Sequence, residues 1–169
     1  ICEAFEKDED VGIIIKTNSG RNTKIDRNIV LRNLEVLLKE VRPKSQNPKV
    51  YLLHGDMSDE DVAALYKDPK VKALVSLTRG EGYGLPILEA AASGLPVIAT
   101  GWSGHLDFMK NVKFISVDHE LIQIHPTRVD DKIFMKNSKW AEPIESDFKK
   151  KIIKFRNSSS TPKEWAVQG

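Results

Sequence analysis

The chain has 169 residues, of which 40% are hydrophobic and 30% charged, and its formal net charge is only +2. This length allows one domain with a hydrophobic core and is too short for two. The small net charge argues for neither nucleic-acid nor membrane binding. The lone Cys2 cannot form an internal disulfide, which favours a reducing compartment. With no signal peptide in residues 1–10 and no apolar run near the roughly 20 residues that span a membrane, we expect a cytoplasmic protein.

Short apolar strands alternate with amphipathic helices along the chain, which is typical of a parallel α/β sheet. The sequence does not begin with methionine, and we expect it to be a fragment of a longer protein. Pro43 should end the first long helix, because proline cannot continue a helix. In chain order, the first part is predicted to contain the end of a helix at 1–7, a strand at 11–15, a polar loop at 18–26, a helix at 30–41, a strand at 50–53 and a short helix at 58–66.

The second part of the chain continues the alternation as far as Asp118, after which it fades. A last amphipathic helix is predicted at 147–156. We therefore expect one α/β domain over residues 1–156, followed by a serine-rich flexible tail over 157–169. The elements before Asp118 are a strand at 71–77, a loop at 78–84, a helix that begins near Pro86 and ends at Gly94, a strand at 97–99, a short helix at 104–110 and a strand at 113–117.

The most informative stretch has the sequence RGEGYGLPILEA, from Arg79 to Ala90, and joins the end of a buried strand to the start of a helix. Ligands bind at this position in open α/β sheets. Three glycines let the backbone come close to a bound group, and the free amides and dipole of the helix start favour an anion. The same glycines would also suit a tight turn that binds nothing, because short glycine patterns are weak signals.

Two glutamates in this stretch favour the ligand-binding interpretation. Glu81 lies in the loop and Glu89 lies one turn inside the helix, roughly 5–6 Å along its axis, so both carboxylates can face one crevice. A carboxylate accepts two hydroxyl hydrogen bonds, which suits a ligand with a sugar on each side of a diphosphate. Without a ligand, the helix dipole alone would favour Glu81, and Glu89 would belong to a solvated helix face.

Glu81 and Glu89 within EGYGLPILEA resemble the paired-glutamate motif of family 4 retaining glycosyltransferases with the GT-B fold. The likeness continues through residues 93–104, takes in residues 53–66 upstream and covers roughly residues 1–117. It implies two Rossmann-like domains that face a cleft, with this chain as the C-terminal, donor-binding domain. The implied reaction, in polysaccharide biosynthesis, moves a sugar from a nucleotide-diphosphate sugar to an unknown acceptor with retention of configuration.

The resemblance also implies roles for individual residues. Glu81 would hydrogen-bond hydroxyls of the transferred sugar and is the candidate catalytic residue, and Glu89 would hold the ribose hydroxyls. Four backbone amides would contact the sugar and the diphosphate, and they belong to Gly82, Tyr83, Gly84 and Leu85. Family members need no metal, and the histidines and acidic residues form no cluster with ligand spacing. We therefore expect no metal and no cofactor besides the nucleotide-sugar substrate.

Several parts of the family pattern are absent from the chain. The domain's first strand, the arginine and lysine that follow it and the acceptor-binding domain are all missing, so we expect weak donor binding and no sugar transfer by this chain alone. A Rossmann-like sheet without its first strand exposes strand edges, which predicts a homo-oligomer or an irregular sheet. Lys16 and Arg79 are candidates for substitute phosphate contacts, but most exposed basic side chains bind nothing specific.

The last predicted helix is basic and carries an apolar stripe made by Phe148, Ile152 and Phe155. Packing of this stripe on the domain is the favoured interpretation. The alternative is a peripheral contact of the basic side chains with the inner face of an anionic membrane. His105 and Asp107 are interpreted as structural residues at the start of a short helix, and residues 140–143, WAEP, have no physical explanation from the sequence.

Two other function classes remain open. A dinucleotide-dependent oxidoreductase could use Gly80, Gly82 and Gly84 as its phosphate loop, but that loop should follow the first strand, whereas here it follows the third. The chain could also be a non-catalytic nucleotide-binding or assembly module that keeps a decayed fold. The presence of both Glu81 and Glu89 speaks against such decay.

Overall fold

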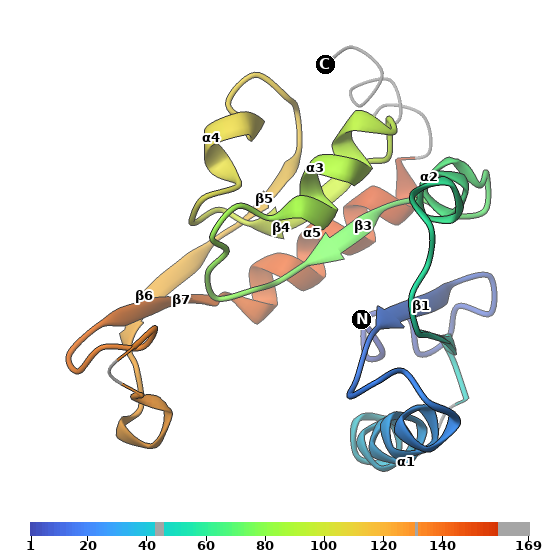
Figure 1. The fold of residues 1–169 in the computed structure, drawn as a ribbon. Coiled ribbons are helices and arrows are strands. Elements are labelled where there is room, and N and C mark those ends of the chain that lie inside the picture. Colours follow the sequence, from blue (N-terminus) through green and yellow to red (C-terminus); the bar gives the residue numbers. More distant parts are fainter. Residues whose placement is uncertain (43–45, 131, 159–169) are drawn as a thin grey trace. The chain divides into compact units, whose positions relative to one another are not determined.

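The computed structural model describes residues 1–42, 46–130 and 132–158, and Figure 1 traces its helices and strands along the chain. The chain divides into two compact units, Ile1–Glu60 and Asp61–Gly169. Helices and parallel strands occur in both units, which confirms the predicted α/β class, and the parallel strands fall into two separate sheets. No helix among the described residues is long and apolar enough to cross a membrane. The predicted tail lies outside the described residues from position 159 onward.

The first unit contains a two-stranded parallel sheet and one long helix. Strand β1 (Gly12–Thr17) pairs with β2 (Lys49–His54), with Ile14 opposite Tyr51. Helix α1 (Lys24–Val41) connects the two strands in sequence, as a parallel pair requires. The side chains of β1 alternate between exposed and half-buried, so only one face of this strand is covered.

Helix α1 begins at Lys24, earlier than the apolar pattern predicted, because polar residues set its start. Thr23 and Asp26 form a capping box. The Asp26 N–H donates to Thr23 Oγ1 at 3.2 Å, and the Thr23 N–H donates to Asp26 Oδ2 at 2.9 Å. Such a box satisfies two N–H groups that otherwise lack partners at a helix start.

The helix predicted over residues 1–7 is not formed, and this segment consists of turns. The Phe5 N–H donates a helix-like hydrogen bond to the Ile1 carbonyl, at 3.1 Å. Short helices are marginal unless an apolar face packs against other elements, and in this segment only Phe5 is buried. The prediction of a helix in this segment was therefore wrong.

The second unit contains a three-stranded parallel sheet in the order β3-β4-β5. Its strands are β3 (Leu74–Ser76), β4 (Val97–Thr100) and β5 (Ile115–Val117), each within a predicted strand or one residue beyond it. Helix α2 (Asp59–Lys67) lies where the chain passes from the first unit to the second. The other helices are α3 (Leu85–Ala92), α4 (Leu106–Met109) and α5 (Glu145–Asn157).

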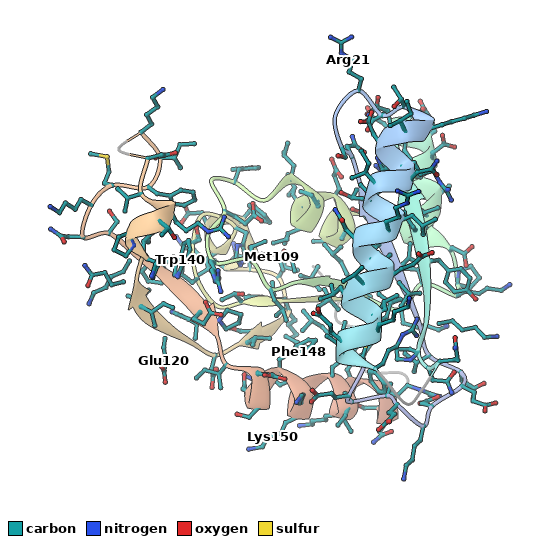
Figure 2. The ribbon with its side chains drawn as sticks, turned by 90° about the horizontal axis from the view of Figure 1, so that it is seen from below. Arg21, Met109, Glu120, Trp140, Phe148 and Lys150 are labelled. Atoms are coloured by element: carbon teal, nitrogen blue, oxygen red, sulfur yellow. The ribbon has the colours of Figure 1, made fainter. Side chains whose placement is uncertain are left out.

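The core of the second unit forms around β4, whose four residues are all buried. Side chains alternate across a strand, and Val97 and Ala99 of β4 share one cluster with α3, which comprises Ile87, Ala90, Leu95, Val97, Ala99 and Met109. Figure 1 shows α3 and α5 on opposite sides of the sheet. In Figure 2, Phe148 points from α5 toward the sheet and Lys150 points away from it. Since Phe148 and Ile152 are buried, the predicted packing of the last helix is confirmed.

The region after Asp118 forms an antiparallel ribbon that the sequence did not predict. Strand β6 (His119–Gln123) pairs with β7 (Lys139–Pro143), and a short 3₁₀ helix, η1 (Pro126–Arg128), lies between them. The ribbon extends away from the three-stranded sheet (Figure 1). Most of β6 is exposed, so its sequence lacks the alternation of apolar and polar residues by which a half-buried strand is recognised.

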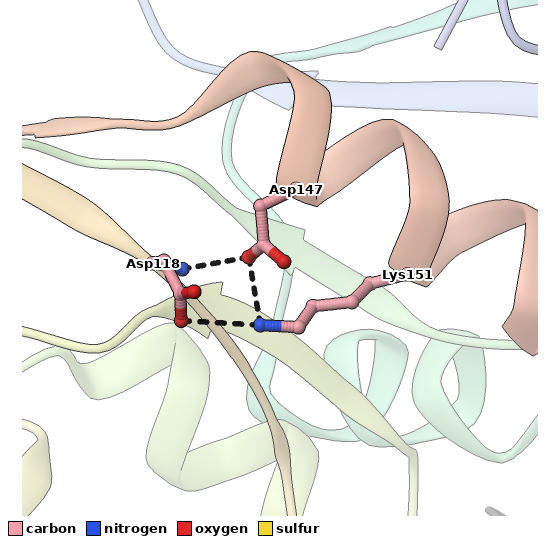
Figure 3. A network of polar contacts seen from close by, with 3 residues as sticks. All are labelled: Asp118, Asp147 and Lys151. Atoms are coloured by element: carbon pink, nitrogen blue, oxygen red, sulfur yellow. Dashed lines mark hydrogen bonds and ion pairs between the residues drawn. The ribbon is translucent and has the colours of Figure 1, made fainter.

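A network of polar contacts attaches α5 to the end of β5 (Figure 3). The Asp147 carboxylate accepts from the Asp118 N–H at 2.8 Å and from Lys151 Nζ at 2.7 Å. Lys151 Nζ also lies 3.2 Å from Asp118 Oδ1. Burial disfavours the charge on Asp147, but the hydrogen bonds from Lys151 and from the Asp118 N–H outweigh it and lower the pKa of this carboxyl below its ordinary 3.8.

Replacement of Asp147 by asparagine should therefore reduce stability at neutral pH. Because the pKa of Asp147 is lower in the folded state, its stabilising effect is complete above the unfolded value near 3.8 and is lost as the pH falls through the folded value. We expect Asp147→Asn to lower the free energy of unfolding by about 1 kcal/mol at pH 7 and by less near pH 3, which lies below the unfolded value. Urea unfolding at both pH values measures this difference.

Asp107→Asn is the matched control, because Asp107 also pairs with a lysine, Lys110, but its side chain is 82% exposed. It should change stability by less than about 0.5 kcal/mol at either pH. Equal effects of the two substitutions, or a loss for Asp147→Asn that is the same at pH 3 and pH 7, would contradict the role given to the network.

Candidate functional site

The loop from residue 77 to Gly84 connects β3 to α3 and contains the glycines of the motif. Gly84 caps α3 with φ 87°, a left-handed conformation that side chains rarely adopt. A Cβ added to Gly84 would also lie 3.1 Å from the Cβ of His105. Pro86 stands in the first turn of α3, as predicted. The glycine at position 84 is therefore required by both the backbone turn and the close packing on His105.

A second loop, residues 101–105, leaves the neighbouring strand β4 and holds the motif loop from one side. Ser103 Oγ accepts a hydrogen bond from the Glu81 N–H at 2.8 Å and donates one to the Glu81 carbonyl at 2.7 Å. The Gly104 N–H donates to the same carbonyl at 3.1 Å. A Cβ on Gly104 would come within 2.1 Å of the Gly82 carbonyl oxygen, so the two backbones touch and only glycine fits here.

Four backbone N–H groups at the start of α3 have unused hydrogen-bonding capacity. No residue in the described part of the chain accepts from the N–H groups of Gly82, Tyr83, Gly84 or Leu85. These four are the amides that the sequence analysis assigned to the ligand. The Glu81 N–H differs, because Ser103 accepts from it. The dipole of α3 adds a partial positive charge at the same place.

The two motif glutamates are accessible. Glu81 is half-buried and Glu89 is exposed, and within the described ranges no side chain or N–H donates to either carboxylate. The pKa of the Tyr66 hydroxyl is raised, mainly by burial and to a smaller extent by the negative charge of Glu89. Since Tyr66 belongs to α2, Glu89 lies close enough to this helix for its charge to act on it. Tyr83 is 53% exposed, and its ring centroid lies 5.2 Å from that of Phe108.

Arg79, at the start of the motif, is held by the ribbon strand β7. Its guanidinium forms two hydrogen bonds with the Glu142 carboxylate, at 2.5 and 2.9 Å, and lies 4.6 Å from the centre of the Trp140 ring. The Ala141 N–H donates to the Arg79 carbonyl at 3.0 Å. The hydrogen bonds with Glu142 raise the pKa of Arg79. These contacts explain the WAEP segment, which anchors the motif loop on β7.

Lys16, the second candidate for a phosphate contact, belongs to the first unit. Its Nζ donates to Asn18 Oδ1 at 2.7 Å and to the Gly55 carbonyl at 2.6 Å. Lys16 therefore ties the end of β1 to the residue after β2. Both basic candidates thus have protein partners, and a phosphate role for either stays a prediction.

His105 and Asp107 lie at the start of a short helix, α4, as predicted. His105 is buried at the start of α4, and its Nε2 lies 2.9 Å from the Thr100 carbonyl. Since a carbonyl only accepts, Nε2 carries the proton. Asp107 is exposed and pairs with Lys110 at 3.1 Å.

Sequence reasoning missed the residues that hold the motif loop in place, chiefly Ser103, Gly104 and Glu142. The one available signal was a serine between glycines directly after a strand, in GWSG. No cluster of three or more metal-ligating side chains occurs in the residues that the structure describes. A shallow hollow on the surface of α5, lined by Lys150, Ile153, Lys154, Asn157 and Ser158, includes no motif residue.

Comparisons with known proteins bear on this arrangement. Two curated proteins, each described as serotype-specific mannosyltransferase WbdA of Escherichia coli, are 42% identical to the chain over 67 residues. These residues make up 39% of this chain and 8% of the relatives, so the chain matches only a small part of their length. A solved structure described as the crystal structure of the GtfA/B complex covers 95% of this chain and 32% of its own, with 16% identity and a TM-score of 0.45.

A family model described as glycosyl transferases group 1 matches residues 33–123. The matched region is more than half of the chain and contains β2, α2, the whole glycine-rich motif and the loop that holds it. This match argues against the oxidoreductase interpretation. The chain belongs to the group 1 glycosyltransferase family.

Proposed function

We propose that the chain is the donor-binding part of a family 4 retaining glycosyltransferase with the GT-B fold. In this proposal it binds a nucleotide-diphosphate sugar, whose sugar passes to an acceptor held by a further domain. Membership in the glycosyltransferase family supports sugar transfer. Donor binding, retention of configuration and the GT-B arrangement are what the resemblance of the motif to family 4 implies.

The observation that carries the proposal is the unused hydrogen-bonding capacity around the start of α3. Four free N–H groups, from Gly82 to Leu85, lie in sequence between two carboxylates that receive no hydrogen bond from the described residues. Donors suit the oxygens of a diphosphate, and carboxylates suit sugar hydroxyls. We assign the ribose hydroxyls to Glu89 and the hydroxyls of the transferred sugar to Glu81.

This arrangement would also assist the departure of the diphosphate. As the bond between the sugar and the diphosphate breaks, negative charge grows on the leaving oxygens, and preorganised N–H groups stabilise that charge. The positive end of the α3 dipole acts in the same direction. The acceptor hydroxyl would attack from the face that the diphosphate leaves, which retains the configuration. We propose no cofactor for this reaction.

The names of the curated relatives support a choice of sugar. Because two mannosyltransferases share 42% identity over 67 residues with the chain, we propose that the transferred sugar is mannose and that the product is a polysaccharide. We further propose that the chain alone transfers no sugar, because the acceptor must be held by another domain. Transfer to any acceptor by the chain alone would refute this second point.

The exposed face of α5 supports a peripheral contact with an anionic membrane at its cytoplasmic face. Lys150 and Lys154 flank Ile153, whose surface is 41% exposed. We expect the chain to sediment with phosphatidylserine vesicles at low salt and to be released at about 0.5 M salt, since screening weakens surface charge. A Lys150→Glu, Lys154→Glu variant should remain in solution. Equal sedimentation of both proteins, or none by either, would contradict the contact.

The two glutamates should differ in what they bind. We expect Glu89→Gln to weaken binding of GDP or UDP and of their sugar conjugates by about tenfold or more, because a charged acceptor for the ribose hydroxyls is lost. Glu81→Gln should weaken binding only of the sugar conjugates, because its partners are on the sugar. Titration calorimetry measures both effects.

Glu120→Gln on β6 is the control, since Glu120 is also an exposed glutamate and lies outside the motif. It should leave all affinities within about twofold. Failure of every nucleotide to bind, or preferential binding of NADH, would reject the donor site. If Glu81→Gln and Glu89→Gln bind the nucleotides and their sugar conjugates as tightly as the parent chain does, the result would favour a non-catalytic binding module.

Arg79 should act on the stability of the loop more than on the diphosphate. Because its guanidinium is bonded to Glu142 and stacked on Trp140, we expect Arg79→Gln to lower the free energy of unfolding by about 1 kcal/mol. The affinity for GDP or UDP should change by less than about threefold. A loss of tenfold or more, with little change in stability, would instead assign Arg79 to the diphosphate.

A further inference from the structure

We propose that Ser103 is a positioning residue that fixes the backbone of Glu81, and so the direction in which its carboxylate leaves the loop. The inference rests on the proposed function, in which the Glu81 carboxylate binds the transferred sugar. The contact itself is a property of the fold. Ser103 lies in the loop between β4 and α4, and it is half-buried.

The backbone of Ser103 is the first reason to look for a role of its side chain. Its φ is 94°, in the region where a residue other than glycine is strained. A glycine would adopt the same conformation without that strain. Glycines stand at positions 101 and 104 of the same short loop, whereas position 103 carries a side chain in spite of the strain.

The hydrogen bonds of the Ser103 side chain show what it does. Its hydroxyl accepts from the Glu81 N–H at 2.8 Å and donates to the Glu81 carbonyl at 2.7 Å. One oxygen thus holds the groups on both sides of the Glu81 Cα atom. This requires an atom that donates and accepts at once, which a hydroxyl provides and an alanine or glycine side chain does not.

The contact also separates Glu81 from the amides that follow it. The Glu81 N–H is used by Ser103, whereas the N–H groups of Gly82 to Leu85 have no acceptor among the described residues. The Gly104 N–H donates to the Glu81 carbonyl as well, at 3.1 Å. Glu81 is therefore attached to the neighbouring loop through its main chain, and its carboxylate is left for a ligand.

Two substitutions distinguish positioning from general stability. Ser103→Gly removes the hydroxyl but also relieves the strain at φ 94°, so its melting temperature should stay within about 3 °C of the parent. Ser103→Ala removes the hydroxyl and keeps the strain, so it should melt lower. Both should speed hydrogen exchange at the Glu81 amide by about tenfold, because each loses the same acceptor.

The control is Asn137→Gly. Asn137 also has a positive φ, 67°, and lies just before β7, outside both loops. The Asn137→Gly substitution should relieve the same kind of backbone strain and leave hydrogen exchange at the Glu81 amide unchanged. Exchange is followed by NMR in the ligand-free chain, so this readout does not depend on whether a donor binds.

Calorimetry completes the test. Both Ser103 variants should lose about tenfold in affinity for GDP-mannose or its UDP analogue, while GDP and UDP alone change by less than about threefold. Unchanged exchange at the Glu81 amide in Ser103→Ala would overturn the positioning role, whatever the nucleotide result. Faster exchange in both variants with no nucleotide binding by the parent chain would uphold the positioning role and reject the proposed function.

Discussion

Parallel pairing of β3 with β4 is the constraint on which the candidate site depends. Neighbouring parallel strands end at the same edge of a sheet, so the loops that follow them must leave the sheet side by side. Leu74 pairs with Val97 and Ser76 with Ala99, which sets the distance between the two loops. The two loops, residues 77–84 and 101–105, then meet through their main chains, although α3 and β4 lie between them in the sequence.

Two different kinds of contact hold the motif loop from two directions. On one side, Ser103 and Gly104 bind the main chain of Glu81, and the absence of a side chain at Gly104 lets the backbones touch. At its start, the loop is held by a charged pair between Arg79 and Glu142. The Glu81 carboxylate and the amides of Gly82 to Leu85, for which the described residues offer no acceptor, therefore belong to a loop and a helix start whose main chain is already bonded to two neighbouring segments.

Sequence patterns predicted those strands and helices whose local residue preferences match the burial that they have in the fold. Strand β4 is fully buried and reads as a short β-branched run, and α3 has Pro86 in its first turn. Strand β6 of the ribbon was missed because an exposed strand carries no apolar alternation. The first turn of α1 was missed because the capping pair, Thr23 and Asp26, and not an apolar residue, marks its start.

The same distinction applies to the site. Glu81 and Glu89 could be named from the sequence, since they belong to one continuous motif. Ser103 and Glu142 could not, because each acts on a residue far away in the chain and only tertiary structure brings the partners together.

The hydrogen bonds between Ser103 and Glu81 have a consequence for the thermodynamics of recognition. A loop that is ordered only when a ligand arrives loses conformational entropy at that moment, and this loss reduces the affinity. Here the ordering of Glu81 takes place when the chain folds, and the strained backbone of Ser103 is part of its cost. A saccharide that reaches this loop would meet a rigid receptor, and most of the interaction free energy would appear as affinity.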